Sequence, residues 1–536
     1  MSSRIKAFFK SLKGLYFNYI YDKKSENLYP RIYLFLILVI ALYLAFFSYI
    51  RSTNFSYDES NTLNIASLSF FDISEALKNE HNFPFYYYIL KIFSYSPHYI
   101  LISKAFNYLI WILCVVSSYF FGKLVFKNKN SALTFTFLVA YSPLLNYYSF
   151  YIRMYGLMFL LLIFYQYFFI RILSREQNTK RNYFLFFVSS LLLSLIHPTS
   201  VFIYFSAAVA IFLLYVYKNQ KNVFVLLTTF LSSIVTLFLF LYKKGIYDTF
   251  MGGGSSYVFD FKPNILGGIN SLLLIPPNAP FYSLVLFLFI YLVYRYFKKL
   301  NPGYLYIYSA SSLIVYLVLV SYIGDKNPRH YIYFLLPLLF AIAKGIISLK
   351  KNVKMWLLPA VILFFVLNFI NFAATSYNLH VENKEFCSKV SEFNNLSSLI
   401  VTNYAVYNPL RECLGKETLP KIYILGGDTL IYQADNKSFK ENVFYQSRRG
   451  GSTDITDSRR FLYRSIKFKG NYPSSYIQEV KNILNQKSYG MEKLIYVTRY
   501  EYGNNNGQIS TDEISLFSNF KFVRFISPSI YIFDVK

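Results

Sequence analysis

The residues best suited to chemistry lie in two short stretches, Tyr57-Asp58-Glu59-Ser60 and Glu80-His81. Both follow an apolar run at 32–50 that is long enough to cross a bilayer. Ionisable groups at the edge of a bilayer are costly unless water, a metal or another charge satisfies them. A carboxylate there can act as a general base on a hydroxyl group. Asp58 and Glu59 are therefore candidate catalytic residues; the alternative is a solvated pair at a helix start.

Two roles stay open for Glu80 and His81. Together with Asp58 they offer oxygen and nitrogen ligands for a divalent metal, the one cofactor that the sequence suggests. Alternatively, they orient the acceptor of a reaction. Pro84 and the three tyrosines after Phe85 help to fix the chain beside them.

Two arginines are candidate ligands for a phosphate group. Arg153 stands between two apolar runs, and Arg329 precedes another run on the same predicted side of the membrane. The planar guanidinium group matches phosphate with parallel donors; the alternative is an arginine that only extends to the interface. His197 ends an apolar run, where a histidine is more often a satisfied interfacial residue than a ligand.

The composition indicates an α-helical polytopic membrane protein. Of 536 residues, 55% are hydrophobic, 21% aromatic and only 15% charged, whereas a soluble protein has about a quarter charged residues. The formal net charge of +27 does not indicate nucleic acid, because the basic residues form short clusters between apolar runs. Cys114, Cys387 and Cys413 make neither a disulfide framework nor a zinc site.

We predict about 11 membrane-spanning helices, each near the length that a bilayer requires. They are 32–50, 99–121, 131–150, 154–174, 183–197, 198–217, 223–242, 281–298, 304–322, 331–348 and 355–373. With a cytoplasmic N-terminus, every predicted cytoplasmic connection is basic, as the positive-inside rule requires. The odd number of spans then places the C-terminus outside. This orientation depends on a split at Pro198, because one merged span would invert everything downstream.

The segments outside the spans differ in character. Residues 1–31 combine basic residues with apolar residues at helical spacing, which predicts a cytoplasmic amphipathic helix on the membrane. Residues 51–98 and 243–280 are predicted extracytoplasmic loops, and 84–98 is predicted to be a helix along the outer surface. The second loop holds a glycine run, at 252–254, that suits a mobile flap or a plain linker.

Residues 374–536 are predicted to form a soluble extracytoplasmic α/β domain. Polar residues return there, and apolar runs shorten to strand length. A helix is predicted at Ser474–Asn485, and a disulfide between Cys387 and Cys413 is allowed. The predicted strands are Ser398–Asn403, Lys421–Leu425, Lys493–Val497, Phe520–Ile526 and Ser529–Val535.

The order of the motifs over residues 32–373 resembles the bacterial branch of the protein O-mannosyltransferase-like glycosyltransferases. The motifs are Tyr57-Asp58-Glu59, His81-x-x-Pro84-x-Tyr86-Tyr87, Ser142-Pro143 leading to Arg153-Met154-Tyr155, His197-Pro198-Thr199 and Arg329-x-Tyr331. This family consists of GT-C-type enzymes that use polyprenyl-phosphate-linked sugars, and the lipid A aminoarabinose transferases are relatives. In one departure, Phe150-Tyr151-Ile152 stands where the family often has an acidic residue before the arginine.

The resemblance implies an enzyme of the bacterial inner membrane that moves a sugar, with inversion, from a polyprenyl phosphate to an acceptor outside. The acceptor would be a hydroxyl or phosphate group on a glycolipid, glycan or protein. Asp58 would be the base, with Glu59 beside it. The implied substrate-binding residues are Glu80, His81, Tyr86, Arg153, Tyr155, His197, Arg329 and Tyr331.

Two other functions stay open. The first is a transporter or flippase for a lipid-linked sugar, which would need charges or broken helices near the membrane midplane. Most predicted spans lack charges at their centres, and the polar groups gather at one face. The second is an oligosaccharide ligase or polymerase, which would share the lipid donor.

Overall fold

The computed structural model describes the chain in two compact units, which we treat separately. One unit contains most of the apolar helices, and the other contains three short helices and a β-sheet. The described residues are 34–44, 57–77, 82–96, 98–174, 179–197, 199–218, 223–242, 304–323, 332–349 and 361–370, with 387–389, 391, 398–403, 422–425, 431–433, 478, 481–482, 484–486, 488–489, 492–497, 518–527 and 530–535.

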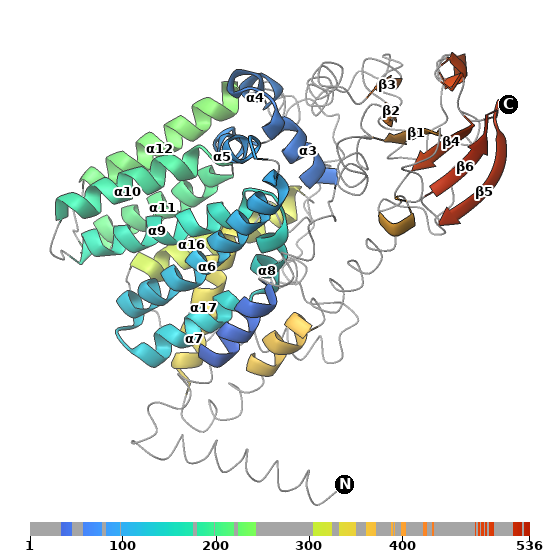
Figure 1. The fold of residues 1–536 in the computed structure, drawn as a ribbon. Helices are drawn as coiled ribbons and strands as arrows, with labels where there is room; N and C mark the ends of the chain where they lie inside the picture. The colour runs from blue at the N-terminus through green and yellow to red at the C-terminus, as the bar shows by residue number, and fades with distance from the viewer. Residues whose placement is uncertain are drawn as a thin grey trace, which may run out of the picture. The chain divides into compact units, whose positions relative to one another are not determined.

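The first unit is a bundle of apolar helices (Figure 1). Within it α9 packs on α10, and α11 packs on α16. Among the described helices, α6 and α9 are long and apolar enough to cross a membrane, and shorter apolar helices accompany them. The helices are α6 (Tyr99–Phe126), α7 (Lys129–Ala140), α8 (Pro143–Phe150), α9 (Tyr155–Leu173), α10 (Thr179–Ser194), α11 (Ser200–Lys218), α12 (Val223–Tyr242), α16 (Tyr304–Ile323) and α17 (Leu335–Ile347).

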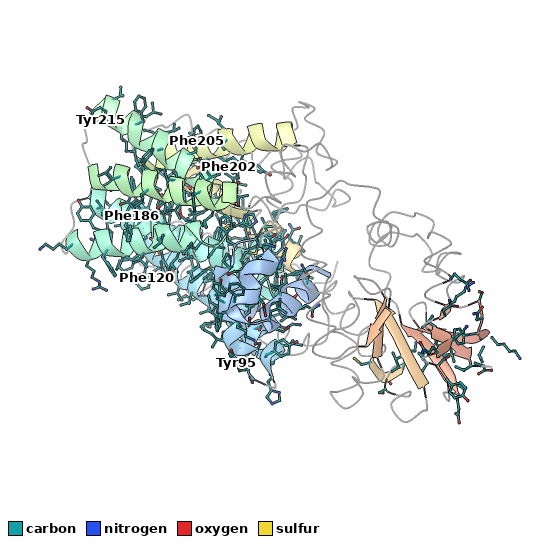
Figure 2. The ribbon with its side chains drawn as sticks, turned by 90° about the horizontal axis from the view of Figure 1, so that it is seen from above. Tyr95, Phe120, Phe186, Phe202, Phe205 and Tyr215 are labelled. Carbon is teal, nitrogen blue, oxygen red and sulfur yellow. The ribbon has the colours of Figure 1, made fainter. Side chains whose placement is uncertain are left out.

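The outward face of the bundle is apolar. Along α6, the exposed side chains are Leu101, Leu109, Leu113, Val116 and Phe120. Figure 2 shows Phe120, Phe205 and Tyr215 at the periphery of the bundle. A helix packed on a soluble protein would carry polar residues on that face. Exposed apolar surface of this extent matches a lipid environment.

The predicted span 131–150 is wrong, because two helices occupy it. α7 ends at Ala140, and α8 begins at Pro143. Proline cannot donate a helical hydrogen bond and pushes the residue before it out of the helical region, and Ser142 is extended with ψ 118°. The split predicted at Pro198 agrees with the structure, since α10 ends at Ser194 and α11 begins at Ser200.

Several predictions lie outside the described residues. They include the N-terminal segment 1–31, the span 281–298 and most of the loop 243–280. Of the predicted spans 32–50 and 355–373, the structure describes helices at 34–44 and 361–370. The total of about 11 spans therefore stays a prediction.

Three short helices open the second unit: α3 (Tyr57–Ser67), α4 (Phe70–Ala76) and α5 (Phe85–Phe93). The helix predicted over 84–98 is present as α5, in a shorter form that starts after Pro84. Helices α3 and α4 fall in a segment predicted as a loop. Both pack against α5.

A mixed six-stranded sheet, in the order β3-β2-β1-β4-β6-β5, completes the second unit. β2, β1 and β4 run parallel, while β3, β6 and β5 are antiparallel to their neighbours. Five strands lie where they were predicted, and β3 was not predicted. The strands are β1 (Ser398–Asn403), β2 (Ile422–Leu425), β3 (Ile431–Gln433), β4 (Lys493–Val497), β5 (Lys521–Ser527) and β6 (Ile530–Asp534).

The structure describes two of the three cysteines. Cys387 is disulfide-bonded, whereas Cys114 is free and buried in the helical bundle. The third cysteine, Cys413, lies outside the described residues. Stable disulfides are typical of extracytoplasmic compartments.

Candidate functional site

Helix α3 is polar in sequence and yet buried. Its sequence is YDESNTLNIAS, and Glu59, Thr62 and Asn64 are each at most 2% exposed. Burying polar groups is costly unless they find hydrogen-bond partners. Leu63 and Ile65 of the same helix are buried and apolar, whereas the buried polar side chains are more typical of a functional site than of a core.

Asp58 and Glu59 lie in the first turn of α3. The macrodipole and the unsatisfied N–H groups of a helix N-terminus stabilise negative charge there. The alternative of a solvated pair is wrong for Glu59, because that side chain is buried. Asp58 is described by its backbone only.

Helix α5 holds the opposite end of α3. The Lys91 ammonium donates a hydrogen bond to the carbonyl oxygen of Ser67, the last residue of α3, at 3.0 Å. A cation at this end complements the helix macrodipole. Burial lowers the pKa of Lys91 below its ordinary value. Lys91 thus connects α5 to the helix that carries Asp58.

Tyr86 is the second residue of α5. It is fully buried, and its ring meets Tyr87 edge-on with centroids 6.4 Å apart. The substrate-binding role predicted for Tyr86 stays a prediction.

In the bundle, the turn between α8 and α9 carries Arg153. α8 ends at Phe150, and Tyr151 is extended. The Arg153 N–H then donates to the Tyr151 carbonyl oxygen at 2.7 Å, which closes a tight three-residue turn. Arg153 is buried, with its guanidinium carbon 6.0 Å from the centroid of the Tyr155 ring.

Helix α6 holds this turn through two residues one helical turn apart. The Asn107 side-chain amide donates to the same Tyr151 carbonyl oxygen. The Trp111 indole N–H donates to Asn146 Oδ1 on α8 at 3.0 Å. All of these side chains except Tyr151 are buried. We call this pair of contacts, from Asn107 and Trp111, the α6 clasp.

Two further residues lie on the same face of α6 as the α6 clasp. Cys114 Sγ lies 3.7 Å from the carbonyl oxygen of Gly156 at the start of α9. One turn before Asn107, Lys104 is only 2% exposed. A lysine buried this deeply near a membrane boundary is by default a candidate for function.

His197 joins the Arg153 turn from the connection between α10 and α11. Its ring centroid is 6.2 Å from that of Tyr155. The Thr199 backbone N–H donates to His197 Nδ1 at 3.3 Å, and the Thr199 hydroxyl lies 2.6 Å from the same nitrogen. Since a backbone N–H only donates, Nδ1 is the acceptor in the contact with Thr199 N. Arg153, Tyr155 and His197 therefore lie together at one end of the bundle.

Some predicted site residues are outside the described part of the chain. They are Glu80, His81, Arg329 and Tyr331. Within the part that the structure describes, no three His, Cys, Asp or Glu side chains gather as metal ligands. The metal hypothesis involves Asp58, Glu80 and His81, so it stays a prediction.

Four residues that contact or flank the site were not predicted: Lys91, Lys104, Asn107 and Trp111. For three of these residues, the sequence contained a pattern that could have indicated a role in the site. Lys91 is the only charged residue in the apolar run of α5, and Lys104 and Asn107 are polar residues inside an apolar span. The partner of Trp111 depends on the fold, so no local pattern reveals it.

No protein-family model and no curated protein sequence matches the chain. Solved structures do match. The crystal structure of ArnT from Cupriavidus metallidurans in the apo state gives a TM-score of 0.52 at 12% sequence identity, over 93% of this chain and 98% of that chain. The structure of that ArnT bound to undecaprenyl phosphate gives 0.49 at 11% identity, over 94% and 98%.

The chain shares the fold of apo ArnT. ArnT is a GT-C-type lipid A aminoarabinose transferase. The GT-C-type fold that the motifs imply is therefore confirmed at this coarse level. Membership in the O-mannosyltransferase-like branch stays a prediction.

Proposed function

We propose that the chain is a membrane glycosyltransferase that moves a sugar from a polyprenyl-phosphate carrier to an acceptor outside the cytoplasm. A shared fold does not establish an activity, so the proposal depends on the site. The observation that carries it is the buried group of Arg153, Tyr155 and His197 at one end of the bundle. A cation beside aromatic rings at a membrane boundary suits a lipid phosphate.

The lipid phosphate binds to Arg153 in this proposal. The guanidinium group donates to phosphate oxygens, and the α6 clasp fixes the turn that carries it. Lys104, buried on the same face of α6, supplies a second positive charge near the outer boundary. These donors stabilise the charge that grows on the phosphate as the sugar leaves.

The acceptor is activated at the start of α3. The Asp58 carboxylate takes the proton of the acceptor hydroxyl as its oxygen attacks the anomeric carbon of the donor. A C–O bond to the acceptor forms while the C–O bond to the phosphate breaks, and polyprenyl phosphate leaves. Attack from the face opposite the phosphate inverts the anomeric centre. One base suffices, because the lipid phosphate is already a good leaving group.

Glu59 has a different role from Asp58. Adjacent residues on a helix point in different directions, so both cannot reach one hydroxyl. Glu59 is buried in the first turn of α3. We assign Glu59 the role of orienting the groups of the site around Asp58. Glu80 and His81 could bind either the acceptor or a metal, and both roles stay open.

A comparison of cells with and without the protein tests the proposal. Mass spectrometry of surface glycolipids and envelope proteins should show a sugar that is present only when the protein is expressed. Loss of the same sugar in cells without the protein, with the lipid-linked sugar held on the cytoplasmic side, would favour the flippase instead, and an unchanged set of glycolipids and proteins would contradict both functions. Loss of whole preassembled chains would favour the ligase or polymerase.

A further inference from the structure

Helices α4 and α5 expose an apolar and aromatic surface. Phe70 and Phe71 on α4 are 46% and 74% exposed, and Ile92 and Tyr95 on or just after α5 are 61% and 72% exposed. We call these four residues the outer stripe. We propose that the outer stripe docks on the outer leaflet of the bilayer, at the boundary between phospholipid headgroups and acyl chains. The inference depends on a membrane location but not on the transfer reaction.

The two helices form one surface because Tyr88 joins them. Its ring lies 5.7 Å from that of Phe70, and its hydroxyl shares a hydrogen bond with the hydroxyl of Ser74 on α4. Tyr88 and Ile92 are four residues apart on α5 and so share a face, and Tyr95 follows two residues after the helix ends. Figure 2 shows the Tyr95 ring projecting from the end of that face.

The charged side chains whose burial is described on these helices are not fully exposed, and the Lys91 ammonium lies 4.8 Å from the centroid of the Tyr95 ring. Asp72 on α4 is half-buried, and Lys91 on α5 is buried with its ammonium directed at the Ser67 carbonyl oxygen. The exposed side chains of the outer stripe carry no charge. Apolar and aromatic residues exposed in this way are typical of helices that lie in a membrane interface.

The outer stripe ends close along the chain to the start of α6. Tyr95 and Tyr99, the first residue of α6, are four residues apart, so at most about 14 Å of extended chain joins them. The exposed face of α6 starts at Leu101 and runs on through Leu109. A surface so close to the outer end of a predicted membrane-spanning helix lies at headgroup depth. Phospholipid is therefore the occupant that we assign to it.

Docking of the outer stripe on the bilayer would set the depth of α3 relative to the membrane surface. Lys91 binds the last carbonyl of α3, and Lys91 lies next to Ile92 of the outer stripe. A shift of α5 relative to the bilayer would move α3 with it. The bilayer surface thus fixes the height of the helix whose first turn carries Asp58.

Spin labels on the full chain test the inference. In a Cys114→Ala background, single cysteines replace Phe71 or Tyr95 and receive a nitroxide, and the protein is placed in nanodiscs of phosphatidylcholine and phosphatidylglycerol. Electron paramagnetic resonance then compares collisions with oxygen, which enriches in lipid, and with a water-soluble nickel chelate. Leu109→Cys, on the exposed face of α6, is the lipid control, and Tyr489→Cys, at a residue 90% exposed before β4, is the water control.

We expect the ratio of oxygen to nickel collisions at Phe71 and Tyr95 to lie nearer to the ratio at Leu109 than to that at Tyr489. A ratio like that at Tyr489 at both positions would overturn the inference. Low collision rates with both reagents would also overturn it, because they would indicate a protein contact such as a second copy. Since all labelled residues are exposed, the labels should leave the fold intact, which the elution volume of each sample checks.

Discussion

Removal of the Asn107 side-chain amide should weaken donor binding without a matching loss in kcat. In Asn107→Leu, the Tyr151 carbonyl oxygen keeps the Arg153 N–H at 2.7 Å but loses its second donor. Because the carbonyl oxygen keeps one donor, the loss is that of one hydrogen bond, about 0.5–1.5 kcal/mol. If this cost falls on the placement of Arg153, KM for the polyprenyl-phosphate donor rises by about 2- to 13-fold.

The assay is sugar transfer by the purified protein in detergent, with the donor titrated at saturating acceptor. Asn182→Leu is the matched control, because Asn182 is also a buried asparagine in the bundle but lies on α10, away from the α6 clasp. Trp111→Phe, which removes the bond to Asn146, should behave like Asn107→Leu. Equal KM values for Asn107→Leu and Asn182→Leu would refute the view that the clasp positions Arg153. Melting temperatures separate a loss of stability from a loss of binding.

Further predictions concern the phosphate, the topology and one pKa. Arg153→Ala should lower transfer and Arg153→Lys should not restore it, since a point charge cannot replace a bidentate fork; normal transfer in both would remove Arg153 from the site. Reporter fusions at Asn130 and Asn436 should report opposite sides of the membrane, and the same side would invalidate the predicted topology. Because burial lowers the pKa of Lys91 below 10.5, the unfolded chain binds more protons in the alkaline range below 10.5. The free energy of unfolding should therefore gain a contribution that rises with pH through that range. Melting curves should lose this contribution in Lys91→Met, and an identical pH profile would contradict the burial.

Hydropathy and proline predicted much of the bundle. Apolar runs predicted the approximate positions of α6, α9, α11 and α12, and Pro198 predicted the break between α10 and α11. The break before Pro143 was missed, because the apolar run continues across it and hides a local turn signal. In the sheet, β3 was missed because three residues are too few to form a recognisable alternating pattern.

The sequence predicted only part of the candidate functional site. Motif order pointed to Arg153, Tyr155 and His197, which the structure brings together. The polar sequence of α3 instead favours exposure, and only packing against other elements buries it. The contacts of Lys91 and Asn107 join residues that are 24 and 44 positions apart. Such contacts depend on the fold, so local patterns cannot supply them.

The central claim is that Asp58 is the base of a sugar transfer. The most direct test is the initial rate of transfer from a polyprenyl-phosphate sugar by Asp58→Asn, with Glu59→Gln as the neighbouring control. Asparagine keeps the size of the side chain but cannot take the proton, so we predict a loss of about 100- to 10,000-fold. A simple surface aspartate would leave the rate unchanged. A dead Glu59→Gln beside a normal Asp58→Asn would reverse the two roles, and normal rates in both variants would contradict the glycosyltransferase proposal itself.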